Sequence, residues 1–230
     1  MRTEHGGGVP QSATFAQTLA TLKAEGSSIL LVGRTSVAAH RAACRRLVGD
    51  EDDSPTRRRL YVHTLDNEHC GSEPGDAIAE SETVLVTQGS DDGTTATPDD
   101  WAGDTQSTVV DSPLLSTLGT EIIDAIEGLT EDDDPDPGEF RLCFDSVTPL
   151  LREHKSQNVF RLLHMITSRT RQVQGMGHFH LPLDRDSDYV RLLEPLFDAV
   201  VEVRRNDESD RLEQRWHLRD RDADSGWIAL

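Results

Sequence analysis

Short, unbroken apolar runs that alternate with amphipathic stretches most constrain the fold of this chain. The run "SSILLVG" at residues 27–33 has an entirely apolar centre, which is typical of a parallel strand buried on both faces. Such runs alternate with segments of helical spacing along the chain. A polar turn, "NDESD", separates the last two strand-like segments. This pattern predicts an α/β fold of three layers with a mainly parallel central sheet and a C-terminal antiparallel hairpin. The predicted strands cover residues 27–33, 57–65, 82–89, 107–111, 140–151 (a strand together with its exit), 175–183, 198–205 and 211–219, and "GWIAL" is a candidate edge strand.

Capping residues predict where the helices between these strands begin. The first helix starts at Ser12 or Thr14 and ends at Gly26, and the last starts at Asp186 or Ser187. The others are predicted over 37–48 with Ser36 as cap, over 114–129 with Ser112 and Pro113 at the start, and over 156–173 with Ser156 as cap.

The chain is expected to form a single domain over residues 12–230, preceded by a disordered tail over 1–11. Two acidic segments, 90–106 and 130–138, interrupt the pattern and are expected to be loops. The second resembles an interdomain linker, but the strands on both sides of it are equally apolar and need each other for burial. We therefore place no domain boundary there.

Composition points to a protein adapted to high salt. The 230 residues contain 42 acidic and 23 basic side chains, for a net charge of −19, with only 5% aromatic residues, and Lys23 and Lys155 are the only lysines. Molar salt screens repulsion between carboxylates to about 3 Å. The alternative is an acidic protein from an environment of ordinary salinity, with disordered acidic loops. In a halophile, acidity argues only mildly against nucleic-acid binding.

Several protein classes are not expected. No apolar stretch approaches the length of a membrane span, and the first residues lack the apolar centre of a signal peptide, so we expect a cytoplasmic protein away from the membrane. Cys44, Cys70 and Cys143 are odd in number and show no metal-binding spacing. They are expected to be buried or incidental thiols in a reducing cytoplasm.

The turn after the first strand has the outline of a phosphate-binding loop without its chemistry. Counted from Gly33, the P-loop template G-x-x-x-x-G-K-[ST] requires glycine, lysine and a hydroxyl where the chain has Ala38, Ala39 and His40. Without the lysine and the metal-binding hydroxyl, efficient phosphoryl transfer is not expected. A purely structural turn is the favoured interpretation.

Some anion-binding capacity nevertheless remains at this turn. Gly33 permits the turn, Thr35 and Ser36 supply hydroxyl groups, Arg34 is adjacent, and the helix start offers backbone N–H groups. Weak binding of an anion or a nucleotide therefore stays open as an alternative to the structural turn.

A second candidate position is "LCFDS" at 142–146. An apolar strand that ends in Asp145, followed by Ser146, places a carboxylate as a Walker B motif does, at the carboxyl edge of the sheet. Aspartate is also a common turn residue, so the motif has weight only together with the first loop.

The order of these motifs resembles the RecA-superfamily ATPases of the KaiC and gas-vesicle-regulator type. Asp145-Ser146 matches a strand that ends in Asp-Ser in that family, and Asp198 matches an aspartate that introduces a late strand. The resemblance covers roughly residues 25–220 and implies a RecA/KaiC-like domain. The ATP-binding residues of the family do not carry over at 38–40, and Glu68 is the only nearby candidate for its catalytic glutamates. The chain is also similar to small haloarchaeal proteins with such a degenerate domain, some labelled HTR-like.

Two further features each have a structural interpretation and a functional one. His178 and His180 alternate on one strand face and could begin a zinc site with His164, Asp145 or Asp184, but a polar strand face is expected instead and no metal is predicted. Arginines cluster in the C-terminal hairpin, where Arg215-Trp216 could contact nucleic acid. Pairing of these arginines with the neighbouring carboxylates is the expected outcome.

Together these features predict a non-catalytic regulatory or signalling interaction module rather than an enzyme. A nucleotide-binding sensor without efficient hydrolysis and a DNA-associated transcriptional regulator are the alternatives. The weak, vestigial nucleotide site would comprise Gly33, Arg34, Thr35, Ser36, Asp145 and Ser146, with ATP as its only candidate cofactor. An unidentified protein partner is expected, nucleic acid is not, and a homo-oligomer stays open because RecA relatives often form rings.

Overall fold

A computed structural model describes residues 11–49, 57–64, 83–88, 106–131, 135–219 and 223–230. Its helices are α1 (Gln11–Glu25), α2 (Val37–Val48), α3 (Leu115–Gly128), α4 (Thr148–Glu153), α5 (Ser156–Gln172), α6 (Asp188–Leu193) and the 3₁₀ helix η3 (Glu194–Leu196). Its strands are β1 (Ser27–Val32), β2 (Arg58–His63), β3 (Thr83–Gln88), β4 (Gln106–Val110), β5 (Phe140–Phe144), β6 (Met176–Leu181), β7 (Ala199–Arg205), β8 (Leu212–Leu218), β9 (Ala223–Asp224) and β10 (Ile228–Ala229).

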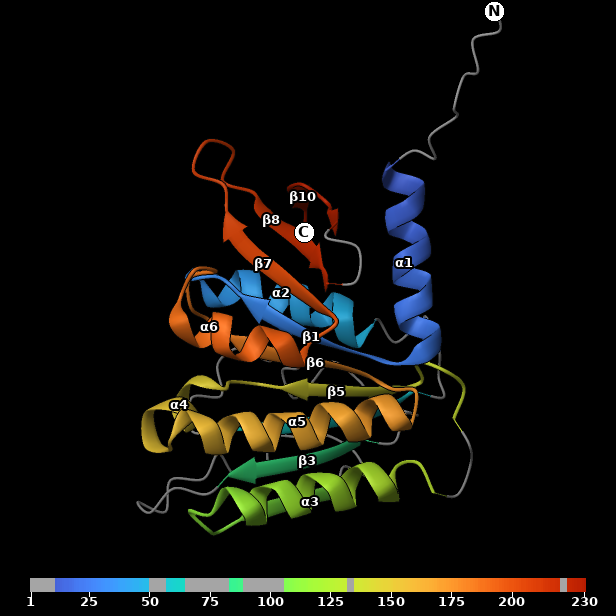
Figure 1. Cartoon of the computed structure of the whole chain (residues 1–230), viewed down its shortest axis with the longest axis vertical. Coiled ribbons are helices and arrows are strands. Elements are labelled where there is room, and N and C mark those ends of the chain that lie inside the picture. Colours follow the sequence, from blue (N-terminus) through green and yellow to red (C-terminus); the bar gives the residue numbers. More distant parts are fainter. Residues whose placement is uncertain (1–10, 50–56, 65–82, 89–105, 132–134, 220–222) are drawn as a thin grey trace, which may run out of the picture.

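All ten strands belong to one sheet, as Figure 1 shows for most of them. The order is β10-β8-β7-β1-β6-β5-β2-β3-β4, with β9 paired to β8. Every pairing from β7 to β4 is parallel, whereas β7 and β8 form an antiparallel hairpin. The predicted parallel sheet and closing hairpin are therefore confirmed, and "GWIAL" does supply an edge strand, β10.

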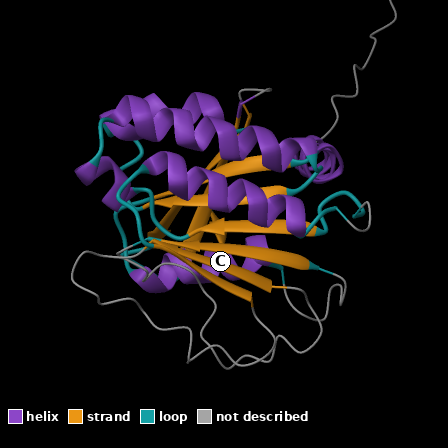
Figure 2. Ribbon diagram, turned by 90° about the horizontal axis from the view of Figure 1, so that it is seen from below, coloured by secondary structure: helices purple, strands orange, loops and turns teal. Residues whose placement is uncertain are grey.

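Helices cover both faces of the sheet, which gives the three predicted layers (Figure 2). Leu30 and Val32 of β1 point into a core that also contains residues of α3, α5 and α6. Ile29 and Leu31 point to the opposite face, into a core with residues of α1 and α2. Because both faces are covered, every residue of β1 and of β5 is buried, which explains their largely apolar sequences, although Ser27, Ser28 and Arg141 are buried with them.

Three details differ from the sequence prediction or sharpen it. Helix α3 begins at Leu115, and Ser112 accepts a hydrogen bond from the Leu114 N–H in the turn before it, so the predicted start at Ser112 and Pro113 is wrong. The segment after β5 forms α4, with Pro149 in its first turn, where only the exit of a strand was predicted. Ser187 does cap α6, because its side chain accepts a hydrogen bond from the Val190 N–H.

Some expectations fall on residues outside the described ranges. These include most of the predicted tail (1–10), most of the first acidic loop (90–105), residues 132–134 of the second, and Cys70 and Glu68. Within the described part of the chain, no helix is long and apolar enough to cross a membrane.

Candidate functional site

Both predicted phosphate-site motifs lie at the carboxyl edge of the parallel strands. The loop 33–36 follows β1 and the pair Asp145-Ser146 follows β5, but β6 lies between these two strands. Two strand spacings separate them, which amounts to about 10 Å. The fold therefore brings the motifs to one edge of the sheet without making them neighbours.

The backbone around Gly33 is committed to packing. Gly33 has φ +130°, and a Cβ atom there would lie 2.2 Å from the carbonyl oxygen of Val203 in β7. The Gly33 N–H donates to the Leu183 carbonyl at 2.9 Å, and the Thr35 N–H donates to the Gly33 carbonyl at 3.0 Å. Close approach of β7 accounts for this glycine, and two N–H groups of the loop are used within the protein.

His40 turns into the core from the position where the P-loop template has its metal-binding hydroxyl. Its side chain is fully buried, and Nε2 lies 2.8 Å from the Gly33 carbonyl oxygen. A carbonyl oxygen only accepts, so Nε2 is the protonated nitrogen and donates this bond. His40 therefore stabilises the loop from the core side and does not face a ligand.

The predicted site residues separate into an exposed and a buried group. Arg34 is 74% exposed and lies 3.9 Å from Asp184, Ser36 is exposed, and Thr35 is half-buried. Asp145 and Ser146, in contrast, are buried behind the sheet edge. A metal-bound phosphate would have to contact the exposed group and the buried group at the same time.

Backbone contacts hold the buried pair in place. The Asp145 N–H donates to the Val62 carbonyl at 2.9 Å, and the Thr64 hydroxyl donates to the Ser146 carbonyl at 2.8 Å. The Thr148 N–H lies 3.3 Å from the Ser146 hydroxyl oxygen, which accepts from it. The first two contacts continue the association of β2 with β5 beyond the strand ends, whereas the third lies within the segment after β5.

Asp198, the third residue of the family resemblance, lies at the opposite edge of the sheet. Its Oδ2 accepts from the Ser28 N–H at 2.8 Å, at the start of β1, and both carboxylate oxygens lie 2.9 Å from Nη2 of Arg171. Asp198 therefore connects β7 to β1 and α5, and it is remote from the loop 33–36.

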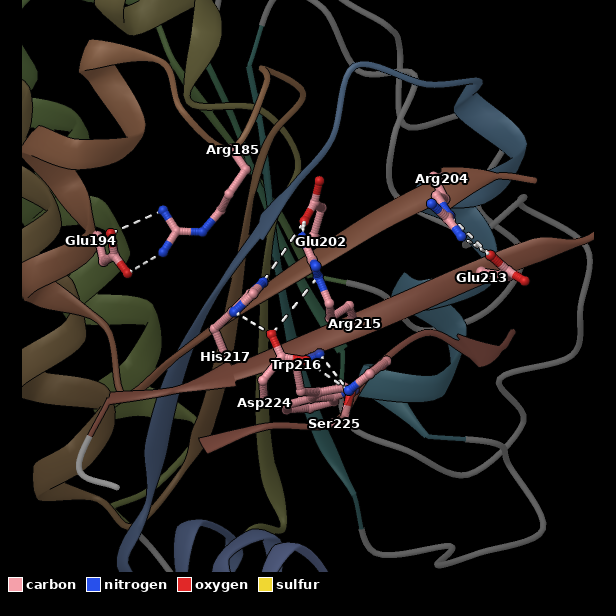
Figure 3. A network of polar contacts seen from close by, with 11 residues as sticks. Arg185, Glu194, Glu202, Arg204, Glu213, Arg215, Trp216, His217, Asp224 and Ser225 are labelled. Carbon is pink, nitrogen blue, oxygen red and sulfur yellow. Dashed lines mark hydrogen bonds and ion pairs between the residues drawn. The ribbon is translucent and has the colours of Figure 1, made fainter. Parts of the chain in front are cut away.

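Three hairpin arginines are paired with carboxylates, as the structural interpretation predicted, and Figure 3 shows Arg204 with Glu213 and Arg215 with Glu202. Arg204 binds Glu213, Arg205 binds Asp210, and Arg215 binds Glu202. The guanidinium groups of Arg204 and Arg215 also lie over the Trp227 ring, at 3.8 and 4.7 Å.

The suggested nucleic-acid contact at Arg215-Trp216 is not available in this arrangement. The Trp216 ring is only 8% exposed and packs edge-on against Phe15 of α1, with ring centroids 6.3 Å apart. The two side chains alternate on β8, so Arg215 points away from the ring toward Glu202.

The structure also brings together a buried group of side chains of the types that bind metal ions, which the sequence pattern does not predict. Cys44, Cys143, His178 and His180 place one ligand atom each within 4.8 Å of all the others. The sequence singles out the two histidines and suggests His164, Asp145 or Asp184 as a third ligand, but none of these three belongs to the group. His164 is exposed on α5, Asp184 faces Arg34, and Asp145 is buried after the end of β5. The missing partners are cysteines on α2 and β5.

Burial determines the protonation state of His178 in this cluster. Desolvation, aided by the Arg141 guanidinium, lowers the pKa of His178 from 6.5 to about 3, so the imidazole is neutral at physiological pH. Cys143 is disulfide-bonded, whereas Cys44 carries a thiol. The expectation that all three cysteines are reduced is therefore wrong for Cys143.

Comparison with known proteins adds a family but no function. No protein of curated function matches the chain. A family of unknown function (DUF7504) matches residues 26–203, a span that runs from the start of β1 into β7 and includes the loop, Asp145 and the cysteine–histidine cluster. Because this match covers most of the chain, the protein belongs to the DUF7504 family.

Proposed function

We propose that this protein is a non-catalytic regulatory or signalling interaction module of a haloarchaeal cytoplasm, built on a degenerate P-loop-type domain. The inward orientation of His40 carries the proposal. In a phosphate-transferring loop this position offers a hydroxyl to Mg²⁺. Here a buried imidazole binds the loop's own Gly33 carbonyl instead.

The neighbouring positions support the same conclusion. Ala39, at the lysine position, is buried, and its N–H donates to the Ser36 carbonyl at 3.0 Å. The loop therefore lacks the cation that bridges phosphate oxygens, and two strand spacings separate it from Asp145. Phosphoryl transfer depends on positioning and on positive charge, and this loop supplies little of either.

Measurement of ATP turnover in molar KCl tests the proposal. We expect no turnover above a protein-free blank. Turnover that disappears in both Asp145→Ala and Ser36→Ala would overturn it. Ser36 is exposed and makes no side-chain cap bond, so its variant keeps the fold even where the Asp145 variant does not.

A nucleotide-binding sensor is the second candidate, favoured by one observation. Arg34, Thr35 and Ser36 lie at the start of the twelve-residue helix α2, at the carboxyl edge of the sheet. Helix starts attract anions through their N–H groups and dipole. A thermal-shift titration separates the candidates, because a ligand at 100 times its Kd adds about 2.7 kcal/mol to the free energy of unfolding. We expect no shift with ATP or ADP, whereas a shift lost in Arg34→Ala would favour the sensor.

Duplex DNA provides a third test. Because carboxylates pair with Arg204, Arg205 and Arg215 of the hairpin, we expect no binding at any salt concentration. Binding whose affinity falls steeply with salt would favour the regulator of transcription instead.

A further inference from the structure

The four ligand atoms of the cysteine–histidine cluster already have nearly the spacing of a tetrahedral zinc centre. Zn–S bonds of about 2.3 Å and Zn–N bonds of about 2.05 Å give tetrahedral edges of about 3.8 Å between sulfurs and about 3.6 Å between sulfur and nitrogen. The Sγ atoms of Cys44 and Cys143 are 3.6 Å apart. Nε2 of His178 lies 3.2 Å from the Cys44 sulfur, and Nε2 of His180 lies 3.9 Å from the Cys143 sulfur.

Three secondary-structure elements produce this spacing. Cys143 of β5 is in register with His178 of β6, so their side chains emerge side by side on one face of the sheet. His180 follows two residues later on the same face. Helix α2 covers that face, and Cys44 lies on its buried side.

The surroundings suit a structural ion rather than a catalytic one. All four ligand residues are at most 2% exposed, so the protein would supply the complete coordination shell. Two thiolates balance the charge of Zn²⁺ and two imidazoles add none, which makes a neutral centre that tolerates burial. Thiolate and imidazole ligands in a tetrahedral arrangement select zinc among the common divalent ions.

We propose that Cys44, Cys143, His178 and His180 form a buried Cys₂His₂ site for Zn²⁺. The site becomes able to bind the ion when the Cys143 disulfide is reduced. A dithiol reductant supplies two electrons and two protons, the S–S bond breaks to give two thiols, and the reductant becomes a disulfide. Zinc binding then forms two Zn–S and two Zn–N bonds and releases one proton each from Cys44 and Cys143. The ion would tie α2 to β5 and β6, and the disulfide withholds one of its ligands.

Metal content of the full chain tests this site in two redox states. Protein reduced with a dithiol and protein kept oxidised are each equilibrated with zinc, freed of loose metal and analysed by mass spectrometry of the elements. We expect about one zinc per reduced chain and less than about a tenth of that per oxidised chain, as the complete ligand set requires. Cobalt in place of zinc should show the visible bands of a tetrahedral ion together with sulfur-to-cobalt charge transfer.

Variants identify the ligands. Cys44→Ser and His178→Gln should lose the metal, whereas His164→Gln, which alters an exposed histidine of α5, should retain it. The cobalt spectrum of the unaltered chain decides the matter even where a ligand variant does not fold. Reduced protein without bound zinc, a cobalt spectrum without sulfur bands, or oxidised protein that holds zinc equally well would each overturn the proposal.

Discussion

Nε2 of His40 donates a hydrogen bond to the carbonyl oxygen of Gly33 across 2.8 Å, inside the core and seven residues along the chain. This contact joins the start of α2 to the turn that ends β1. The same position in a phosphate-binding loop would face outward toward a metal ion. This hydrogen bond therefore distinguishes a loop that stabilises the fold from a loop that binds a ligand.

Replacement of His40 by serine should destabilise the protein without creating an ATPase. The variant matches the loop template at this position but leaves the buried Gly33 carbonyl without its donor and opens a cavity. We expect the free energy of unfolding to fall by about 2 kcal/mol. Denaturant unfolding in molar KCl measures this, with His164→Ser on the surface of α5 as a control that should stay within about 0.5 kcal/mol. Equal stability of H40S and wild type would mean that the contact contributes nothing.

Gly33→Ala should destabilise the protein through a steric conflict with β7. The backbone has φ +130°, and the added Cβ would lie 2.2 Å from the Val203 carbonyl oxygen. Relief of this clash requires β1 and β7 to separate, so we expect a loss of more than about 1 kcal/mol. Gly128→Ala is the matched control. No atom lies within 4 Å of its added Cβ, and the change from glycine at the end of α3 should cost nothing. A G33A variant as stable as G128A would contradict the assigned packing role.

Asp198→Ala should weaken the junction of β1, β7 and α5. The change removes the acceptor of the Ser28 N–H and the partner of Arg171. Because solvent screens the ion pair, most of the effect comes from the backbone N–H, and we expect a loss of about 1–2 kcal/mol. Asp188→Ala removes a fully exposed partner of Arg191 and should leave the melting temperature unchanged. Similar melting temperatures for D198A and D188A would show that Asp198 has no such role.

The stability of the protein should fall in mild acid, in part through His63. Burial lowers the pKa of His63 from 6.5 to about 4, so at pH 5 the unfolded chain binds a proton that the folded imidazole does not. Below pH 6.5 this favours unfolding, by up to roughly 1.4 kcal/mol per pH unit, until the folded group also titrates near pH 4. Above pH 7 the group contributes no pH dependence.

Unfolding curves measured between pH 4 and 8 check this contribution. His63→Gln should flatten the acid slope, whereas His164→Gln should leave it as in the wild type. An unchanged slope in H63Q would place the acid sensitivity elsewhere in the chain.

Local sequence patterns were sufficient to predict most elements of the fold. The apolar runs correspond to β1, β2, β3, β5 and β6, and the helical spacing corresponds to α1, α2, α3 and α5, each within a few residues. Burial on both faces favours a nearly continuous apolar run in a parallel central strand, so most of the signal is intrinsic to the segment. The helix α4 was missed because six residues between a strand and another helix carry too little periodicity to be recognised.

The candidate sites depended more strongly on tertiary structure. The missing lysine and hydroxyl of the loop were evident from the sequence, but the inward turn of His40 was not, because it depends on how α2 packs on the sheet. The fastening role of Asp198 likewise required the pairing of β7 with β1, which are far apart along the chain.

The sequence by itself determined the alternation of strands and helices, the closing hairpin and the absence of a complete phosphate-binding motif. Only the tertiary structure decided that Cys44, Cys143 and His178 meet, since 99 residues separate the two cysteines and 134 separate Cys44 from His178. The physical reason is strand order: β6 pairs with β5, and α2 crosses above both. Spacing along a chain reveals ligands that share one element, whereas ligands on three elements become neighbours only when the sheet forms.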